Sequence, residues 1–108
     1  MKYAEITGWG SYVPPVLMTN DDMGQVIDTS DEWIFSRSGI KQRHYSHVST
    51  GKMAWLACER ALDAAGINAE DVDLIILGST SPEEICPNTA SYIKNELGAT
   101  KAAAFDLN

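Results

Sequence analysis

A tryptophan and an arginine four residues apart are the side chains of this sequence best suited to bind a ligand. Trp33 and Arg37 follow a polar stretch in which Thr29 or Ser30 can cap the start of a helix. Because residues four apart project from the same face of a helix, the indole and the guanidinium would lie side by side. A flat aromatic ring beside a fixed cation suits a purine base and its phosphates.

The same spacing also describes an ordinary amphipathic helix. In that interpretation Trp33 packs into a core and Arg37 pairs with Asp31 or Glu32, two carboxylates that are favoured in the first turn of a helix. Spacing alone favours this plainer interpretation. The nucleotide-binding hypothesis therefore needs support from elsewhere in the sequence.

Nucleophilic catalysis would need an activated serine or cysteine with a base in reach. Cys58 and Cys86 have neither metal-ligand spacing nor a CxxC partner, so we expect free thiols packed as small apolar groups. His44 and His47 lie in a polar stretch with no serine or cysteine at an informative spacing. The sequence also has no glycine-rich phosphate loop. We therefore predict no catalytic residue, no metal site and no bound cofactor in this chain.

Composition limits the class of protein. At 108 residues, with 44% hydrophobic and 21% charged residues, the chain can form one small globular domain with a modest core. No apolar run is long enough to span a membrane, and the first residues lack the apolar segment of a signal peptide. The net charge of −7 argues against nucleic acid as a partner, although the cations between residues 37 and 60 leave a local basic face possible. We predict a cytoplasmic protein with no membrane partner.

Caps, glycines and apolar runs predict the elements that would position these residues. Asn20 and Thr50 are the predicted caps of two helices, while Gly39, Gly66 and Gly98 are placed to end helices. In Gly8-Trp9-Gly10 the glycines would let the backbone approach a neighbour closely. The predicted elements are a strand at 2–10, helices at 20–27, 30–36, 51–65 and 88–97, a loop or irregular strand at 40–48, and strands at 72–78 and 102–107.

The order of these elements predicts an α/β fold. The run 72–77 is apolar except for Asp73, which is typical of a strand buried on both faces and paired in parallel with its neighbours. Long crossovers between strands also imply parallel pairing within a sheet layered with helices. The loop at 79–88 follows the carboxyl end of that strand, the usual place for a ligand. Since the last strand runs to the end of the chain, we expect an incomplete sheet and a fragment of a larger fold.

The amino-acid sequence of several stretches resembles that of one protein family. The sequence at 28–34, Asp-Thr-Ser-Asp-Glu-Trp-Ile, followed by Gly39-Ile40 and Arg43-His44, resembles the N-terminal signature of beta-ketoacyl-[acyl-carrier-protein] synthase III. The resemblance covers the whole chain, including Gly8-Trp9-Gly10-Ser11-Tyr12-Val13-Pro14, Thr80-Ser81, Pro87 and Ala104-Phe105-Asp106-Leu107. It implies a thiolase-like α/β fold, of which residues 1–108 would be the N-terminal part of the first half. It also implies an acyltransferase that loads an acyl group from acyl-CoA onto a cysteine and condenses it with malonyl-acyl carrier protein.

The resemblance assigns roles to five residues. Trp33 matches the tryptophan that stacks on the adenine of CoA, Arg37 the arginine beside it, and Thr29 a polar neighbour. Thr80 and Cys86 match loop positions near the acyl pocket. With this support, nucleotide binding becomes the favoured interpretation of Trp33.

One of these positions departs from the family. In well-known bacterial members a bulky aromatic precedes the proline that matches Pro87, whereas this sequence has Cys86. A smaller side chain there would leave room for a primer longer than acetyl. The remaining pocket residues lie outside this chain, so its sequence does not determine the primer.

The resemblance places the catalytic residues outside this chain. The family's cysteine would follow just after Asn108, and its histidine and asparagine would lie further on. We therefore expect no catalytic residue in this chain. The implied partners are acyl-CoA as substrate, malonyl-acyl carrier protein, the remainder of the polypeptide and a second subunit in a homodimer. Two alternatives stay open: another thiolase-superfamily condensing enzyme, such as a quinolone-forming or head-to-head long-chain enzyme, and a non-catalytic CoA-binding or interaction module.

Overall fold

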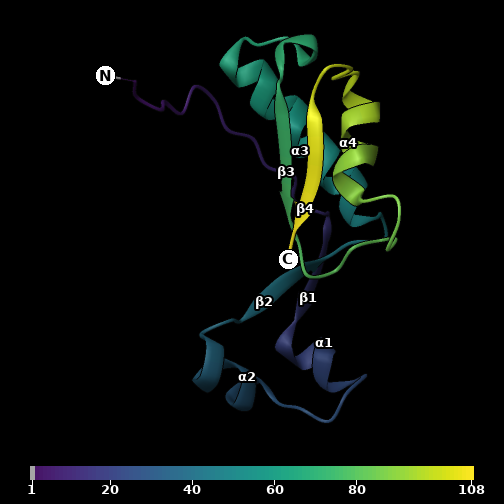
Figure 1. The fold of residues 1–108 in the computed structure, drawn as a ribbon. Helices are drawn as coiled ribbons and strands as arrows, with labels where there is room; N and C mark the ends of the chain where they lie inside the picture. The colour runs from purple at the N-terminus through teal and green to yellow at the C-terminus, as the bar shows by residue number, and fades with distance from the viewer. Residues whose placement is uncertain (1) are drawn as a thin grey trace. The chain divides into compact units, whose positions relative to one another are not determined.

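A computed structural model describes residues 2–108 and divides them into two compact units (Figure 1). The larger unit contains residues 2–12 and 48–108, and the smaller unit contains residues 13–47. Each unit has its own small sheet. The predicted α/β class is confirmed. No helix within residues 2–108 is long and apolar enough to cross a bilayer.

The larger unit is a parallel strand pair with helices. Its elements in chain order are α3 (Thr50–Ala65), the 3-10 turn η1 (Ala69–Asp71), β3 (Leu74–Gly78), α4 (Thr89–Leu97) and β4 (Ala103–Leu107). Strands β3 and β4 are parallel, in a register that pairs Leu74 with Ala103 and Gly78 with Leu107. Helix α4 makes the crossover and packs on both strands and on α3 (Figure 1). The parallel pairing predicted from the crossover length is confirmed.

The core of the larger unit is small and lies on the side of the sheet that faces α4. It consists of Ile75, Ala90, Ile93, Ala99 and Ala102. The prediction that β3 is buried on both faces is wrong for these residues: Leu74 and Ile76 are about half exposed, and so are Phe105 and Leu107 on the same face of β4. An apolar run shows that a strand is suited to burial, but an element must lie on each face to bury it.

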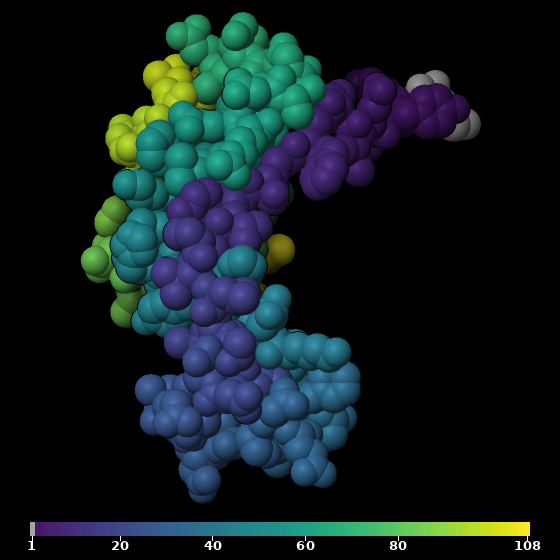
Figure 2. Space-filling view, turned by 180° about the vertical axis from the view of Figure 1, so that it is seen from behind, coloured from purple at the N-terminus to yellow at the C-terminus, as the bar shows by residue number. Residues whose placement is uncertain are grey.

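The N-terminal segment was predicted as a strand, and this prediction is wrong. Residues 2–12 pair with no strand: in the described chain the two sheets consist of β1 with β2 and of β3 with β4. The close approach expected at its glycines is confirmed: a Cβ on Gly8 would lie 2.6 Å from the carbonyl oxygen of Ala61, on α3. Before these glycines Tyr3 and Ile6 are almost fully exposed, and Figure 2 shows this purple segment extending away from the rest of its unit.

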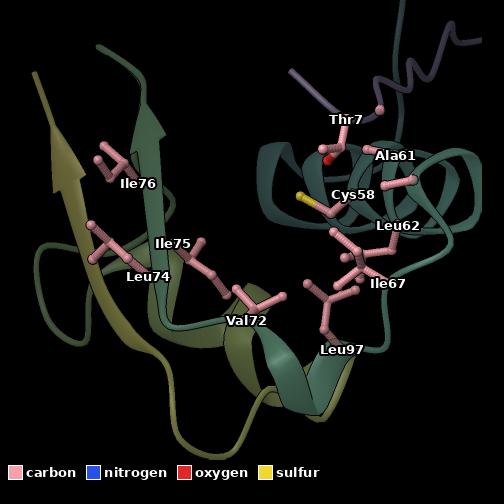
Figure 3. A pocket seen from close by; sticks show the side chains of 12 residues that line it. Thr7, Cys58, Ala61, Leu62, Ile67, Val72, Leu74, Ile75, Ile76 and Leu97 are labelled. Carbon is pink, nitrogen blue, oxygen red and sulfur yellow. The ribbon is translucent and has the colours of Figure 1, made fainter. Parts of the chain in front are cut away.

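An apolar gap of about 310 Å³ separates α3 from β3 in the larger unit (Figure 3). Cys58, Ala61 and Leu62 of α3 lie across it from Ile75 of β3, and Thr7 closes one side. The lining contains no charged side chain. Ligand sites normally combine apolar walls with a few convergent polar groups. The gap offers nothing that would hold a phosphate, and we assign no nucleotide to it.

The smaller unit is an antiparallel strand pair with two short helices. Its elements are β1 (Val16–Thr19), α1 (Asn20–Gly24), α2 (Asp31–Ser38) and β2 (Gln42–Tyr45). The register pairs Val16 with Tyr45 and Thr19 with Gln42. Strand β1 was missed, and β2 occupies part of the stretch expected as a loop or irregular strand. Both strands are four residues long and pair over a long separation, so neither leaves a clear local pattern.

Two predicted helix caps are wrong by one residue. Thr19, not Asn20, caps α1: its hydroxyl accepts from the Asp22 amide, and the Asp22 carboxylate accepts from the Thr19 amide at 2.8 Å. The same carboxylate also accepts from the Thr19 hydroxyl at 2.7 Å, and the two bonds from the amide and the hydroxyl of Thr19 lower the pKa of Asp22. Ser49, not Thr50, caps α3. In each case a hydroxyl residue with extended backbone directly precedes the predicted cap, and extended backbone is what the N-cap position requires.

We expect the isolated 108-residue chain to show no condensing activity and no cooperative unfolding. Its sheet leaves an apolar face open, and such surfaces favour association. Size-exclusion chromatography should find large species, and a thermal melt should be broad. Replacing Ile76 and Phe105 with threonine on the open face should reduce the association. A purified monomer with a sharp thermal transition would contradict this expectation.

Candidate functional site

Helix α2 brings together the tryptophan and the arginine that the sequence singled out. The Arg37 guanidinium carbon lies 5.0 Å from the centroid of the Trp33 ring, within the range of a cation–π contact. The helix begins where Ser30 accepts a hydrogen bond from the Trp33 amide, so Ser30 is the cap of the two residues considered. It ends at Gly39, whose φ of 70° is in the left-handed region. The predicted geometry of this pair is confirmed.

The smaller unit contains neither contact that the plainer interpretation of this helix requires. Trp33 is 57% exposed, so it is not a core residue of its unit. Arg37 forms an ion pair with neither Asp31 nor Glu32. The ion pair found within residues 2–108 joins Lys101 to Asp73. An exposed indole that carries a cation on its ring is a surface to which a planar, negatively charged ligand can bind.

Thr29 lies next to the tryptophan in a shallow hollow. Asp28, Thr29, Ser30 and Trp33 line this hollow, which measures about 410 Å³. The hydroxyl oxygen of Thr29 is buried and has no hydrogen-bond partner among residues 2–108. A buried hydroxyl without a partner costs free energy unless something binds it. Thr29 and Trp33 thus share one hollow, and Arg37 lies against the Trp33 ring, so the three residues form one cluster on α2 and the segment before it.

Asn20 connects this helix to the rest of the smaller unit, a role that sequence reasoning missed. It was predicted only as a helix cap. Its side-chain amide instead donates to the Asp31 carboxylate at 2.8 Å and to the Ile40 carbonyl at 2.7 Å. Its side-chain oxygen accepts from Arg43. Nothing in the local sequence indicates these bonds, because their partners lie 11 to 23 residues away.

The other two candidates, Thr80 and Cys86, lie in the 79–88 loop of the larger unit, and both are exposed. The amide of Ser79 donates to Leu107 at one end of the loop, and the Gly51 amide at the start of α3 donates to Glu83 in its middle. The expectation that Cys86 packs as a small apolar group is wrong. The loop turns its side chain to solvent, since no element of this unit covers it.

The loop ends at α4, whose N-terminus is held by β4. The two carboxylate oxygens of Asp106 accept from the amides of Thr89 and Ala90 at 2.9 and 2.7 Å. Asn88 caps the helix by accepting from the Ser91 amide at 2.8 Å. Negative charge at this end of a helix is favourable. The position of Cys86 is therefore fixed from both sides, by Glu83 before it and by the start of α4 after it.

Neither cysteine has the surroundings of a nucleophile. Cys58 lies half-buried on α3, and this burial raises the pKa of its thiol, which keeps it protonated at neutral pH. Within residues 2–108 no group of three His, Cys, Asp or Glu side chains is arranged to hold a metal ion. The exposed Trp33 ring with Arg37 on it remains the candidate ligand surface of the described residues.

Comparison with known proteins identifies one group of relatives. No family model matches the chain. Among curated proteins, it is 51% identical over 106 residues to beta-ketoacyl-[acyl-carrier-protein] synthase III 2 of Vibrio cholerae, a match that covers 98% of this chain and 29% of that protein. The chain spans about a third of the length of such relatives.

Solved structures give the same result. The crystal structure of 3-oxoacyl-[acyl-carrier-protein] synthase III from Aquifex aeolicus matches 94% of this chain with a TM-score of 0.86 and 40% identity, over 33% of its own length. The priming beta-ketosynthase of the R1128 polyketide pathway matches 94% of the chain, also with a TM-score of 0.86, at 33% identity over 31% of its own length. The resemblance to synthase III and to its thiolase-like fold is confirmed.

Proposed function

We propose that this chain is the N-terminal part of a beta-ketoacyl-[acyl-carrier-protein] synthase III and supplies its binding site for the adenine end of CoA. The complete enzyme would transfer an acyl group from acyl-CoA to a cysteine outside this chain and condense it with malonyl-acyl carrier protein. The proposal also includes a cytoplasmic location and a homodimer. It rests on the high identity to relatives of that name and on the fold shared with them.

The observation that supports a nucleotide site is the exposed Trp33 ring, whose centroid lies 5.0 Å from the guanidinium carbon of Arg37. Stacking of a base on an aromatic ring contributes about 1–3 kcal/mol and tolerates any base. The guanidinium supplies a permanent positive charge and a fork of donors for the phosphates of CoA.

A fluorescence titration tests the site directly. With excitation restricted to tryptophan, CoA should quench the emission of the complete enzyme, while phosphopantetheine, which has no adenine, should not. In a Trp33→Phe variant the quenching should disappear although Trp9 and Trp55 remain. Equal quenching in the variant and the wild type would exclude Trp33 from the site.

Thr29 gives a second, smaller prediction. Thr29→Val keeps the shape of the side chain and removes the buried hydroxyl that has no partner. If this hydroxyl binds CoA, the Michaelis constant for acyl-CoA should rise about threefold to tenfold, the usual effect of one hydrogen bond. Thr29→Ser keeps the hydroxyl and should bind normally. A valine variant with an unchanged constant would mean that the hydroxyl makes no contact with the ligand.

A priming ketosynthase of polyketide synthesis is the second candidate. It is favoured by the equal TM-score to such an enzyme and by the small residue at position 86. Both candidates use the same nucleotide site and differ in the primer that they accept. The primer preference of the complete enzyme separates them.

A further inference from the structure

We propose that Asn20 is the positioning residue of the nucleotide site, because its side chain fixes both ends of α2. This inference rests on the proposed function, since it concerns the helix that carries Trp33 and Arg37. Asn20 itself does not touch the ligand in this proposal. It acts through Asp31, the first residue of α2, and through Ile40, which lies just beyond its last residue.

Asn20, the first residue of α1, forms hydrogen bonds to α2, to β2 and to the segment between them. Its amide group donates to Asp31 and to Ile40 at 2.8 and 2.7 Å. Its backbone amide donates to the carbonyl of Lys41 at 3.2 Å. Arg43 of β2 donates both to the Asn20 side chain and, at 3.3 Å, to the carbonyl of Thr19. One side chain thus connects α1, α2 and β2.

The burial of Asn20 shows how much the unit depends on it. Within residues 13–47, all of which the structure describes, it is the only buried residue, with 1% of its surface exposed. The smaller unit therefore has a polar centre in place of a hydrophobic core. Hydrogen bonds are directional, so a polar centre fixes the orientation of α2 more strictly than apolar packing of the same size would.

Only an amide side chain fits this position. Asn20 donates from its nitrogen to two acceptors and accepts through its oxygen from a cation. Aspartate would lose both donors and place a second carboxylate beside Asp31. Leucine has a similar size but would leave buried polar groups without partners. Either substitution should therefore displace α2 and, with it, the Trp33 ring.

The test uses Asn20→Asp and its rescue in the complete enzyme. Asn20→Asp should raise the Michaelis constant for acyl-CoA about tenfold, as expected for a broken buried hydrogen bond, and leave kcat unchanged. Adding Asp31→Asn reverses the donor and the acceptor, because the new amide at position 31 can donate to the carboxylate at position 20. The double variant should recover the part of the affinity that depends on the bond to position 31, while the bond to the Ile40 carbonyl stays lost. A residue with a general structural role would not be rescued in this way.

Two results would overturn the inference: a folded Asn20→Asp enzyme with the wild-type Michaelis constant, or a double variant no better than the single one. If Asn20→Asp does not fold, Asp31→Ala removes one bond at an exposed position and should raise the constant, whereas Glu32→Ala, its neighbour in the first turn, should not. Equal constants in these two alanine variants would also overturn it. Trp33→Ala in the same assay separates the two proposals, because an unchanged constant there refutes the nucleotide site itself.

Discussion

Trp33→Ala should raise the Michaelis constant of the complete enzyme for acyl-CoA by about tenfold to hundredfold. The indole is exposed and carries the Arg37 guanidinium on its ring. Loss of base stacking costs about 1–3 kcal/mol, and each 1.4 kcal/mol is a factor of about ten. Because the adenine lies far from the reacting thioester, kcat should change little. Steady-state kinetics with varied acyl-CoA and saturating malonyl carrier protein measure both constants.

Three controls make this result specific. Trp9→Ala removes another exposed indole, from the N-terminal segment, and should leave the constant unchanged. Trp33→Phe keeps an aromatic face and should lie between the wild type and the alanine variant. The Michaelis constant for malonyl carrier protein should not change. An unaltered constant for acyl-CoA in a correctly folded Trp33→Ala enzyme would refute the nucleotide site.

Cys86→Phe should shift the primer preference of the complete enzyme toward acetyl-CoA. By resemblance this position lies at the acyl pocket, where relatives carry a bulky aromatic and this chain carries a cysteine. The wild type should therefore prefer a medium or branched acyl group. Each methylene buried in the added space contributes about 0.8 kcal/mol, or roughly fourfold in the specificity constant. Over several carbons this is the largest change in selectivity that one residue of the chain should produce.

The measurement compares kcat/KM for acetyl-CoA with that for an eight-carbon acyl-CoA in both proteins. Ile85→Phe is the matched control, since it adds an aromatic ring at the neighbouring position, which is 99% exposed. It should leave the ratio unchanged. The shift would be smaller if neighbouring side chains already fill the space. Acetyl-CoA preferred by both the wild type and Cys86→Phe would refute the role of this position.

The elements supported by strong local signals could be predicted from the sequence. A left-handed residue at a helix end almost requires glycine, so Gly39, Gly66 and Gly98 marked three helix ends. An apolar run and a long crossover predicted the parallel pair β3 and β4. The four-residue spacing placed Trp33 and Arg37 on one face of α2, as the structure has them. All of these are properties of short segments.

Only the tertiary structure decided what depends on partners distant in sequence. Residues 2–10 have the composition of a strand but pair with no other strand of the described chain. The short strands β1 and β2 do pair, although Thr19 and its partner Gln42 are 23 positions apart and α1 and α2 lie between them. The exposure of Trp33 and Cys86 depends on which elements cover them. The role of Asn20 arises from acceptors and a donor that the fold brings to it from α2 and β2. Local sequence determines where a helix starts and stops, but burial and hydrogen-bond partners are set by the whole fold.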